Sequence, residues 1–168
     1  MPTTRLTLSV LAILGVATIA AQEPVADFRG LAWGTPLEEA TLDGKKVDLQ
    51  YYTTINNENY YYLPDDELEI GTAELQQIFY VFDEHKRFFK VVIDGKPESN
   101  EEMSFILAKR FGSPTTIRRR ETKFISGWEI GSVDVLLTEW RSEDYLLQIE
   151  SVADDRYENE VNSEIDDF

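Results

Sequence analysis

The sequence predicts an α+β fold, an antiparallel sheet with one firm helix and one short helix. Residues 75–93 hold two runs rich in aromatic and β-branched residues around a charged turn, which is typical of a hairpin. Residues 99–112 combine a helix start signal, apolar residues at helical spacing and a stop signal. Residues 115–152 divide into three further runs of strand character.

The length and composition indicate one globular domain and exclude several classes of partner. The chain has 168 residues, of which 42% are hydrophobic, so it can bury a sizeable core. Its formal net charge of −16 argues against nucleic acid and against anionic membrane surfaces as partners. It has no cysteine, which excludes disulfides, thiolate catalysis and thiolate metal sites. No cofactor is predicted.

The chain divides into three parts. Residues 1–21 are predicted to be a secretory signal peptide, with Arg5 ahead of an apolar run that ends in small residues. The alternatives are an uncleaved anchor or a buried helix, and the absence of a following cysteine removes the usual lipoprotein attachment residue. Residues 22–153 are expected to form the single α+β domain, and residues 154–168 an acidic tail, either a frayed helix or disordered. We therefore expect a periplasmic or secreted protein with no integral membrane span after cleavage.

The start of the domain is expected to hold a short strand and the short helix. Residues 28–31 could be the strand. Thr35 and Glu38 match a capping box with proline at the first helical position, which predicts a helix over residues 36–42.

A tyrosine-rich hairpin should follow. Its arms are expected near residues 47–54 and 59–63, because asparagines at 56, 57 and 59 give a turn signal. A further short strand is expected at residues 67–70.

Residues 75–93 are expected to lie at the centre of the sheet, with the turn at residues 83–86. Side chains alternate across a strand, so each arm divides into two faces. In the first arm Ile78, Tyr80 and Phe82 should share one face, and Gln77, Phe79 and Val81 the other. In the second arm Phe89, Val91 and Ile93 should share one face, and Phe88, Lys90 and Val92 the other. Both faces carry apolar residues, so we expect both to be at least partly covered.

The firm helix and three more strands complete the domain. Ser99 opens a second capping box, and Gly112 followed by Pro114 marks the helix end. The apolar residues at helical spacing are Met103, Ile106, Leu107 and Phe111. Strands are then expected at residues 122–128, 133–140 and 145–152, as an antiparallel meander. Because a helix followed by strands occurs twice, the domain could consist of two similar helix-plus-strands halves.

Three motifs give the chain a resemblance to a known group. F-x-G-x-x-W-G-T begins at Phe28, I-x-Y-x-F at Ile78, and F-G-x-P at Phe111. In these motifs, over most of the predicted mature chain, the protein resembles a group of small exported bacterial domains of unassigned function. Its element order is more distantly similar to outer-membrane assembly lipoproteins and β-lactamase inhibitor proteins, without the lipid-bearing cysteine of the first or the disulfides of the second. The resemblance implies a fold and an exported location, and it carries over no catalytic residue.

The usual catalytic and metal-binding motifs are missing from the sequence. His85, the one histidine, lies in a charged turn and is expected to be an exposed loop residue. No serine elbow or Gly-rich phosphate loop occurs, and zinc would need further ligands. Acidic clusters at residues 65–67 and 154–155 lack the spacing of a strong calcium site, so no metal site is predicted. The basic run at residues 118–120 is expected to pair within the chain or with the acidic tail, with partner binding as the alternative.

The tyrosine-rich hairpin is the predicted binding surface, because tyrosine combines a large contact area with a polar tip. The candidate ligand-binding residues are Tyr51, Tyr52, Tyr60, Tyr61, Tyr62, Trp128 and Trp140. Their alternative role is an ordinary structural one in the sheet. The favoured function is a non-enzymatic exported module that binds a protein, peptide or envelope component. The alternatives are a hydrolase that uses two carboxylates on envelope glycan or peptide, and a structural domain kept soluble by its acidic surface.

Overall fold

The computed structural model describes residues 25–142 and 144–152. Its strands are β1 (Asp27–Phe28), β2 (Leu31–Ala32), β3 (Thr41–Leu42), β4 (Lys45–Lys46), β5 (Gln50–Ile55), β6 (Glu58–Tyr62), β7 (Glu69–Ile70), β8 (Ala73–Phe82), β9 (Phe88–Gly95), β10 (Thr116–Arg119), β11 (Lys123–Ile130), β12 (Val133–Trp140) and β13 (Tyr145–Ser151). Its helices are the 3-10 turns η1 (Leu37–Glu39) and η2 (Pro97–Ser99) and the α-helix α1 (Asn100–Phe111).

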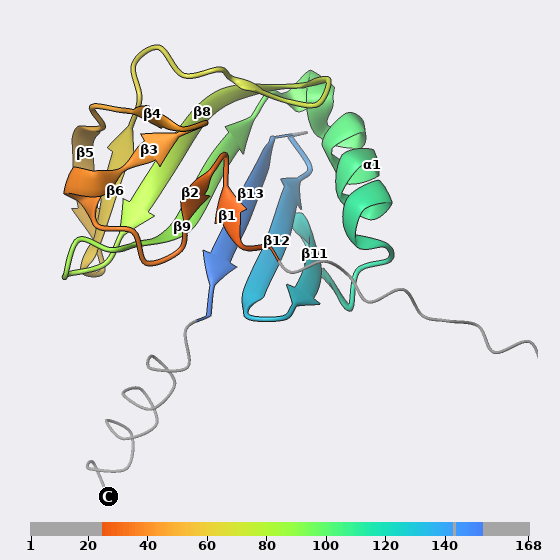
Figure 1. Cartoon of the computed structure of the whole chain (residues 1–168). Helices are drawn as coiled ribbons and strands as arrows, with labels where there is room; N and C mark the ends of the chain where they lie inside the picture. The colour runs from red at the N-terminus through yellow and green to blue at the C-terminus, as the bar shows by residue number, and fades with distance from the viewer. Residues whose placement is uncertain (1–24, 143, 153–168) are drawn as a thin grey trace, which may run out of the picture.

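A nine-stranded antiparallel sheet organises the molecule (Figure 1). Its order is β10-β11-β12-β13-β9-β8-β6-β5, with β7 paired to β8 off this path. Two meanders each run from an outer edge to the centre, where β9 and β13 pair antiparallel. The prediction of an antiparallel sheet with a helix is confirmed, and the fold is α+β-like but mostly β. The edge strand β10 was not predicted as a separate element.

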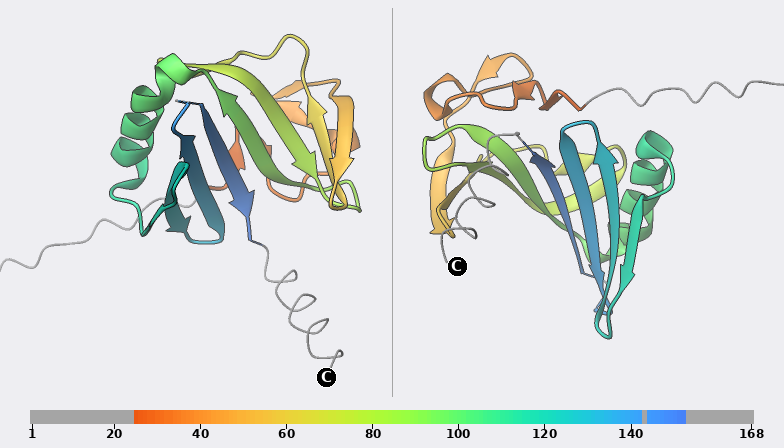
Figure 2. Two further views of the ribbon diagram at one scale, coloured as in Figure 1. Left: turned by 180° about the vertical axis from the view of Figure 1, so that it is seen from behind. Right: turned by 90° about the horizontal axis from the view of Figure 1, so that it is seen from below.

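The main core lies on the sheet face that carries α1 and the N-terminal segment. Figure 2 shows both of these on the same side of the sheet. Met103, Leu107 and Phe111 of α1 are buried there, against sheet residues such as Leu137 and Leu147. The opposite face, which we call the outer face, carries a smaller buried cluster. This cluster consists of Val81, Phe89 and Val92, with Tyr60, Phe79 and Leu146 packed against it.

A bulge at the start of β9 corrects one part of the predicted face pattern. The register pairs Val81 with Lys90 but Phe82 with Phe88, so Phe89 is the extra residue. Phe88 therefore lies in the main core and Phe89 in the outer cluster, the reverse of the simple alternation. The central placement of the hairpin is confirmed, and so is the shared face of Ile78, Tyr80 and Phe82, which all lie in the main core.

A buried polar network ties the N-terminal segment to the core. The Tyr80 hydroxyl donates to the Asp66 carboxylate at 2.9 Å, and the Arg29 guanidinium donates to the same carboxylate at 2.7 Å. Tyr80 is fully buried, and burial raises the pKa of its hydroxyl, which stays a donor. Asp66 therefore faces inward instead of lining a calcium site at residues 65–67.

The predicted short helix is reduced to the three residues of η1, and its capping box is wrong. Pro36 has an extended backbone with ψ of 147°, and no side-chain cap bond is formed. The Phe88 amide instead donates to the Thr35 carbonyl at 2.9 Å, in a strand-like pairing with the start of β9. The predicted strand at residues 28–31 is likewise divided into β1 and β2 by a turn at Arg29, whose φ is 53°.

The long helix is confirmed, but the predicted role of Ser99 is not. α1 begins at Asn100 and ends at Phe111, and Gly112 caps it with a φ of 75°. The Ser99 side chain makes no cap bond, and its hydroxyl accepts the amide of Glu74 at 3.1 Å. Ser99 therefore links the helix start to β8.

The predicted signal peptide at 1–21 and acidic tail at 154–168 lie outside the described residues. Within the described part of the chain, no helix is long and apolar enough to cross a membrane. The sheet contains two four-strand meanders, and the helical segments ahead of them, η1 and α1, differ in length.

Replacing Ser99 with Ala should lower the free energy of unfolding by about 1 kcal/mol, because the amide of Glu74 loses the acceptor that the buried Ser99 hydroxyl provides. Denaturant unfolding measures the loss, and amide exchange locates it. We expect faster exchange at Glu74 and unchanged exchange in the first turn of α1. Faster exchange confined to the first turn of α1 would restore the capping-box interpretation.

The close contact between Gly95 and the Tyr145 ring can be tested by substitution. A Cβ at Gly95 would lie 1.8 Å from Cζ of Tyr145, its cross-strand partner. Gly95→Ala should therefore displace a buried ring and cost about 2 kcal/mol in denaturant unfolding. The Tyr145 hydroxyl has no hydrogen-bond partner among the described residues, so Tyr145→Phe should change stability by less than about 0.5 kcal/mol. A large loss for Tyr145→Phe would contradict this account.

Candidate functional site

The five predicted tyrosines lie on the β5–β6 hairpin at one end of the sheet. Asn56 and Asn57 join the strands with φ of 49° and 63°, as a two-residue hairpin turn requires. Neighbouring tyrosines turn to opposite faces of the sheet, so the set divides into an outer and an inner group.

The outer group consists of Tyr52, Tyr60, Tyr62 and Phe79. Tyr52 and Phe79 have ring centroids 5.0 Å apart, and Tyr60 meets Phe79 edge-on at 6.2 Å. Tyr62 meets Tyr52 at 6.4 Å and donates its hydroxyl to Gln50. The group continues the apolar cluster of the outer face, and Tyr52 is its most exposed member at 61%.

The inner group is part of the wall of the main core. Tyr61 packs edge-on against Phe82 at 5.4 Å and against Tyr51 at 5.7 Å. Burial, and then the neighbouring Tyr51, raises the pKa of Tyr61. Tyr61 is therefore largely structural, whereas Tyr51 remains 58% exposed.

A charged group borders the outer aromatic rings. The Lys90 ammonium is buried and lies 2.7 Å from the Glu58 carboxylate and 3.3 Å from that of Glu150. Tyr60 donates its hydroxyl to Glu58 at 3.0 Å. Burial, followed by the charge of Glu58, raises the pKa of Tyr60 to about 12, so it remains a donor. These contacts join β6, β9 and β13 across the outer face.

β5 is a free edge of the sheet. No described strand pairs with its outer side. Its sequence, Gln-Tyr-Tyr-Thr-Thr-Ile, has no charged residue. Ile55 is 50% exposed, in addition to Tyr51 and Tyr52. A polypeptide that approached this edge would meet unpaired backbone groups and apolar side chains together.

The two predicted tryptophans do not join the tyrosine surface. Trp128 is 4% exposed, and its indole donates to the Gly112 carbonyl at 2.9 Å, so it lies in the core below the end of α1. Trp140 is 36% exposed at the end of β12, and β13, β9, β8 and β6 separate it from β5. It lines a different cavity, beside Arg119 and Arg120.

His85 and the carboxylates are the remaining residues with chemical potential. His85 is exposed in the turn of the central hairpin, with Glu84 at 3.7 Å. Among the described residues no group of three or more His, Cys, Asp or Glu side chains could hold a metal ion. Glu129 and Asp134 face each other across β11 and β12 and line one cavity of about 410 Å³. Burial, and then the charge of Glu129, raises the pKa of Asp134.

Comparisons with protein-family models, with characterised proteins and with solved structures return no match. The resemblance to small exported domains therefore stays a prediction, and the site has to be interpreted from its own geometry.

Lys90 should be important for stability. Lys90→Met leaves Glu58 and Glu150 facing each other without the cation between them. We expect a loss of roughly 2 kcal/mol, less than for fully buried pairs because both carboxylates retain some solvent contact. Adding Glu58→Gln should recover part of that loss, as a double-mutant cycle by denaturant unfolding would measure. Strictly additive losses would show that the charges are not coupled.

Proposed function

We propose that this protein is a non-enzymatic binding module that takes up an extended polypeptide segment at the free edge of β5. One observation carries the proposal: a six-residue edge strand without charged residues presents Tyr51, Tyr52 and Ile55 at exposures of 58%, 61% and 50%. Addition of a strand to an exposed sheet edge is a common mode of peptide recognition.

The two edges of the sheet support this assignment by their contrast. Sheet edges are usually protected by charged side chains, because a bare edge pairs with other chains. β10, the opposite edge, carries Arg118 and Arg119, and β5 carries no charge. In a chain with 32 acidic residues, an uncharged edge strand is a specific departure from the rest of the surface.

The hairpin turn indicates which backbone groups would bind the partner. In a two-residue hairpin the residues that flank the turn, Ile55 and Glu58, form a hydrogen-bonded pair. Thr54 and Asn59 are then a non-hydrogen-bonded pair, so the amide and carbonyl of Thr54 point away from β6. A partner strand would use these groups for affinity.

The side chains that flank this edge would supply specificity. Tyr52 lies on the outer face against Phe79, and Tyr51 lies on the opposite face against Tyr61. Alternate side chains of an added strand would meet one or the other. Tyrosine is well suited to this role, because its ring gives contact area at small entropic cost.

We also propose that the protein is exported and that its domain consists of two similar halves, as predicted from the sequence. The signal-peptide pattern supports a periplasmic or secreted location, with a protein, peptide or envelope component as partner. The two meanders that meet at β9 and β13 support two similar helix-plus-strands halves.

A carboxylate-dependent hydrolase is the second candidate. The cross-strand pair of Glu129 and Asp134 in one cavity favours it. Against it, Glu129 is exposed, and Arg118 and Lys123 line the same cavity. An activity screen on glycan and peptide substrates, with Asp134→Asn as the variant, would test it.

Panning of phage-displayed random peptides of about twelve residues against the purified protein tests the binding proposal. We expect enriched sequences with alternating apolar residues. On titration with the enriched peptide, the amide of Thr54 should become protected from exchange. The double variant Tyr52→Ser with Ile55→Ser should weaken binding of that peptide by at least about tenfold, since two exposed apolar contacts are lost.

The matched control is Phe105→Ser with Ile117→Ser, which removes two exposed apolar side chains elsewhere, at 67% and 57% exposure. It should leave peptide affinity unchanged. Equal losses for both double variants, or binding with no change at Thr54, would contradict strand addition at β5. A concentration-dependent dimer that the β5 variant abolishes would identify a second copy as the occupant of the edge.

A further inference from the structure

The outer face of the second meander, β10 to β13, has no covering layer in the described part of the chain. α1 and the N-terminal segment both lie on the other side of the sheet (Figure 2). A cavity of about 410 Å³ opens on this bare face, and we call it the outer hollow. Gly127 leaves the middle of its floor without a side chain, between Thr116 and Leu136. A sheet face that carries apolar residues is normally covered by a second layer.

The floor of the outer hollow is apolar and partly exposed. Leu136 on β12 is 40% exposed. Ile125 on β11 also lines the hollow, and the strand register joins it through Thr138 to Leu146 on β13. Leu146 packs against the buried cluster of the outer face. The apolar surface of the central strands therefore continues, uncovered, onto this meander.

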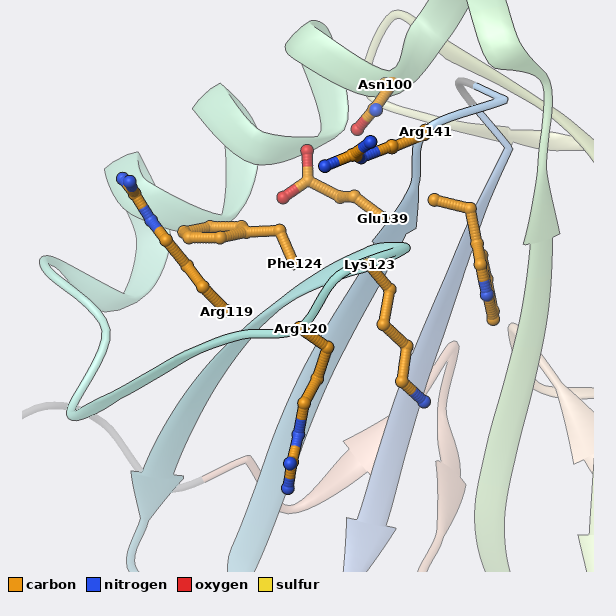
Figure 3. A pocket seen from close by; sticks show the side chains of 8 residues that line it. Asn100, Arg119, Arg120, Lys123, Phe124, Glu139 and Arg141 are labelled. Carbon is orange, nitrogen blue, oxygen red and sulfur yellow. The ribbon is translucent and has the colours of Figure 1, made fainter.

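Opposite charges mark the two ends of the hollow along β11. Arg118 and Lys123 line one end. Glu129 and Asp134 line the other. Figure 3 shows the Lys123 side chain on the outer side of the sheet, whereas Arg119 lies on the side of α1. None of the four lining charges forms an ion pair with a described residue, so the hollow offers charges of both signs to whatever covers it.

The chain leaves the sheet beside the acidic end of the hollow. β13 ends at Ser151, and the Val152 amide donates at 2.7 Å to the carbonyl of Ser132, in the turn that precedes Asp134. Sixteen residues, 153–168, follow this point. The hollow extends for roughly 20 Å along β11, and sixteen residues span about 24 Å as a helix and more when extended. The segment is therefore long enough to turn back and cover the hollow.

The sequence of residues 153–168 complements the hollow in apolar pattern and in charge. Four apolar residues recur at spacings of four, four and three, so a helix would carry them on one side. They are Tyr157, Val161, Ile165 and Phe168. Arg156, the one basic residue, comes near the start, where the hollow is acidic, and five acidic residues follow Tyr157. Asp154 and Asp155 precede Arg156, and aspartate is common where a chain reverses.

The charge of the segment makes this placement selective. Residues 153–168 carry a net charge of −6 in a chain of −16, so most of the surface repels them. A second apolar cavity, of about 520 Å³, lies between α1 and β1. Asp27, Glu67 and Glu69 line it, and one of its two arginines is already paired with Asp66. The outer hollow is therefore the better match for the segment.

We propose that residues 153–168 fold back over the outer hollow and bind there. Their apolar side chains lie on Ile125 and Leu136. Their later acidic residues lie beside Arg118 and Lys123. The protein thereby supplies the cover that its second meander otherwise lacks. The same contact closes the cavity of the carboxylate pair considered above for hydrolysis. The site is distinct from the β5 edge and does not rest on the binding function proposed there.

A spin label on the segment tests the proposal in the full chain. The protein has no cysteine, so Ser163→Cys gives one site for a nitroxide. In NMR spectra of the isotope-labelled protein, we expect the amides of Ile125, Leu136 and Thr138 to lose most of their signal, and those of α1 and β5 to keep theirs. Loss at β5 instead, or no loss in the sheet, would overturn the proposal. Loss only when the spin label and the isotope are on separate copies would assign the hollow to the segment of a second copy and overturn the contact within one chain.

Substitutions beyond Val152 leave the described fold unaltered and measure the contact. Val161→Ser with Ile165→Ser removes two apolar side chains and should lower the ratio of bound to free segment by at least about tenfold, seen as recovery of the Leu136 signal. The matched control, Asn159→Ser with Asn162→Ser, should change the ratio by less than about twofold. Equal effects of the two double variants would contradict an apolar contact.

Two further double variants with equal charge change separate the hollow from the overall field of the protein. Arg118→Gln with Lys123→Gln should lower the bound ratio several-fold, and more at low ionic strength than at high. Lys45→Gln with Lys46→Gln, which changes exposed cations elsewhere, should lower it by less than about twofold. An equal fall for both would show diffuse attraction and overturn the assignment of the segment to this hollow.

Discussion

The structure depends on a central strand that is buried on both faces. Every residue of β9 from Phe88 to Ile93 is buried, including Lys90. The bulge at Phe89 gives each face of the sheet one of the two adjacent phenylalanines. A strand of this kind needs cover on both sides. α1 and the N-terminal segment cover one side, and the aromatic side chains of the sheet itself cover part of the other.

Lys90 shows how the outer face accommodates this burial. Its ammonium lies 5.2 Å from the Phe89 ring centroid and between two carboxylates. The aliphatic stem can extend the apolar cluster while the charge is satisfied across three strands. The outer face is therefore partly apolar without a covering layer, and its apolar part leads directly to the tyrosines of β5 and β6. The candidate binding edge is in this sense a continuation of the central packing.

The sequence predicts those elements whose signals are local. The central hairpin and α1 follow from alternation, helical spacing and the glycine at the helix end. The capping boxes at Thr35 and Ser99 could not be interpreted correctly, because backbone groups distant in sequence bind these two residues. The carbonyl of Thr35 accepts the amide of Phe88, and the hydroxyl of Ser99 accepts the amide of Glu74. The position of the bulge in β9 also depends on the partner strand, so alternation alone assigned Phe88 and Phe89 to the wrong faces.

The candidate sites likewise depend on contacts between segments that are distant in sequence. Composition identified the tyrosines, but the division into outer and inner groups and the free edge at β5 depend on strand order, which a single sequence does not give. The basic run at residues 118–120 was visible, but the position of Arg118 and Arg119 on an edge strand depends on the pairing of β10 with β11. The predicted pairing of this run with the acidic tail stays a prediction, because the tail lies outside the described residues.

The two edge strands of the sheet thus differ in how far they are protected against pairing with another chain. β10 is short and bears arginines, which discourage the addition of a strand. β5 is longer and uncharged, and its flanking side chains are apolar rings that a partner strand would cover. Because the same sheet protects one edge and leaves the other bare, edge exposure is not a general property of this fold. The bare edge is a local feature of β5, and the polypeptide partner that we propose would cover it.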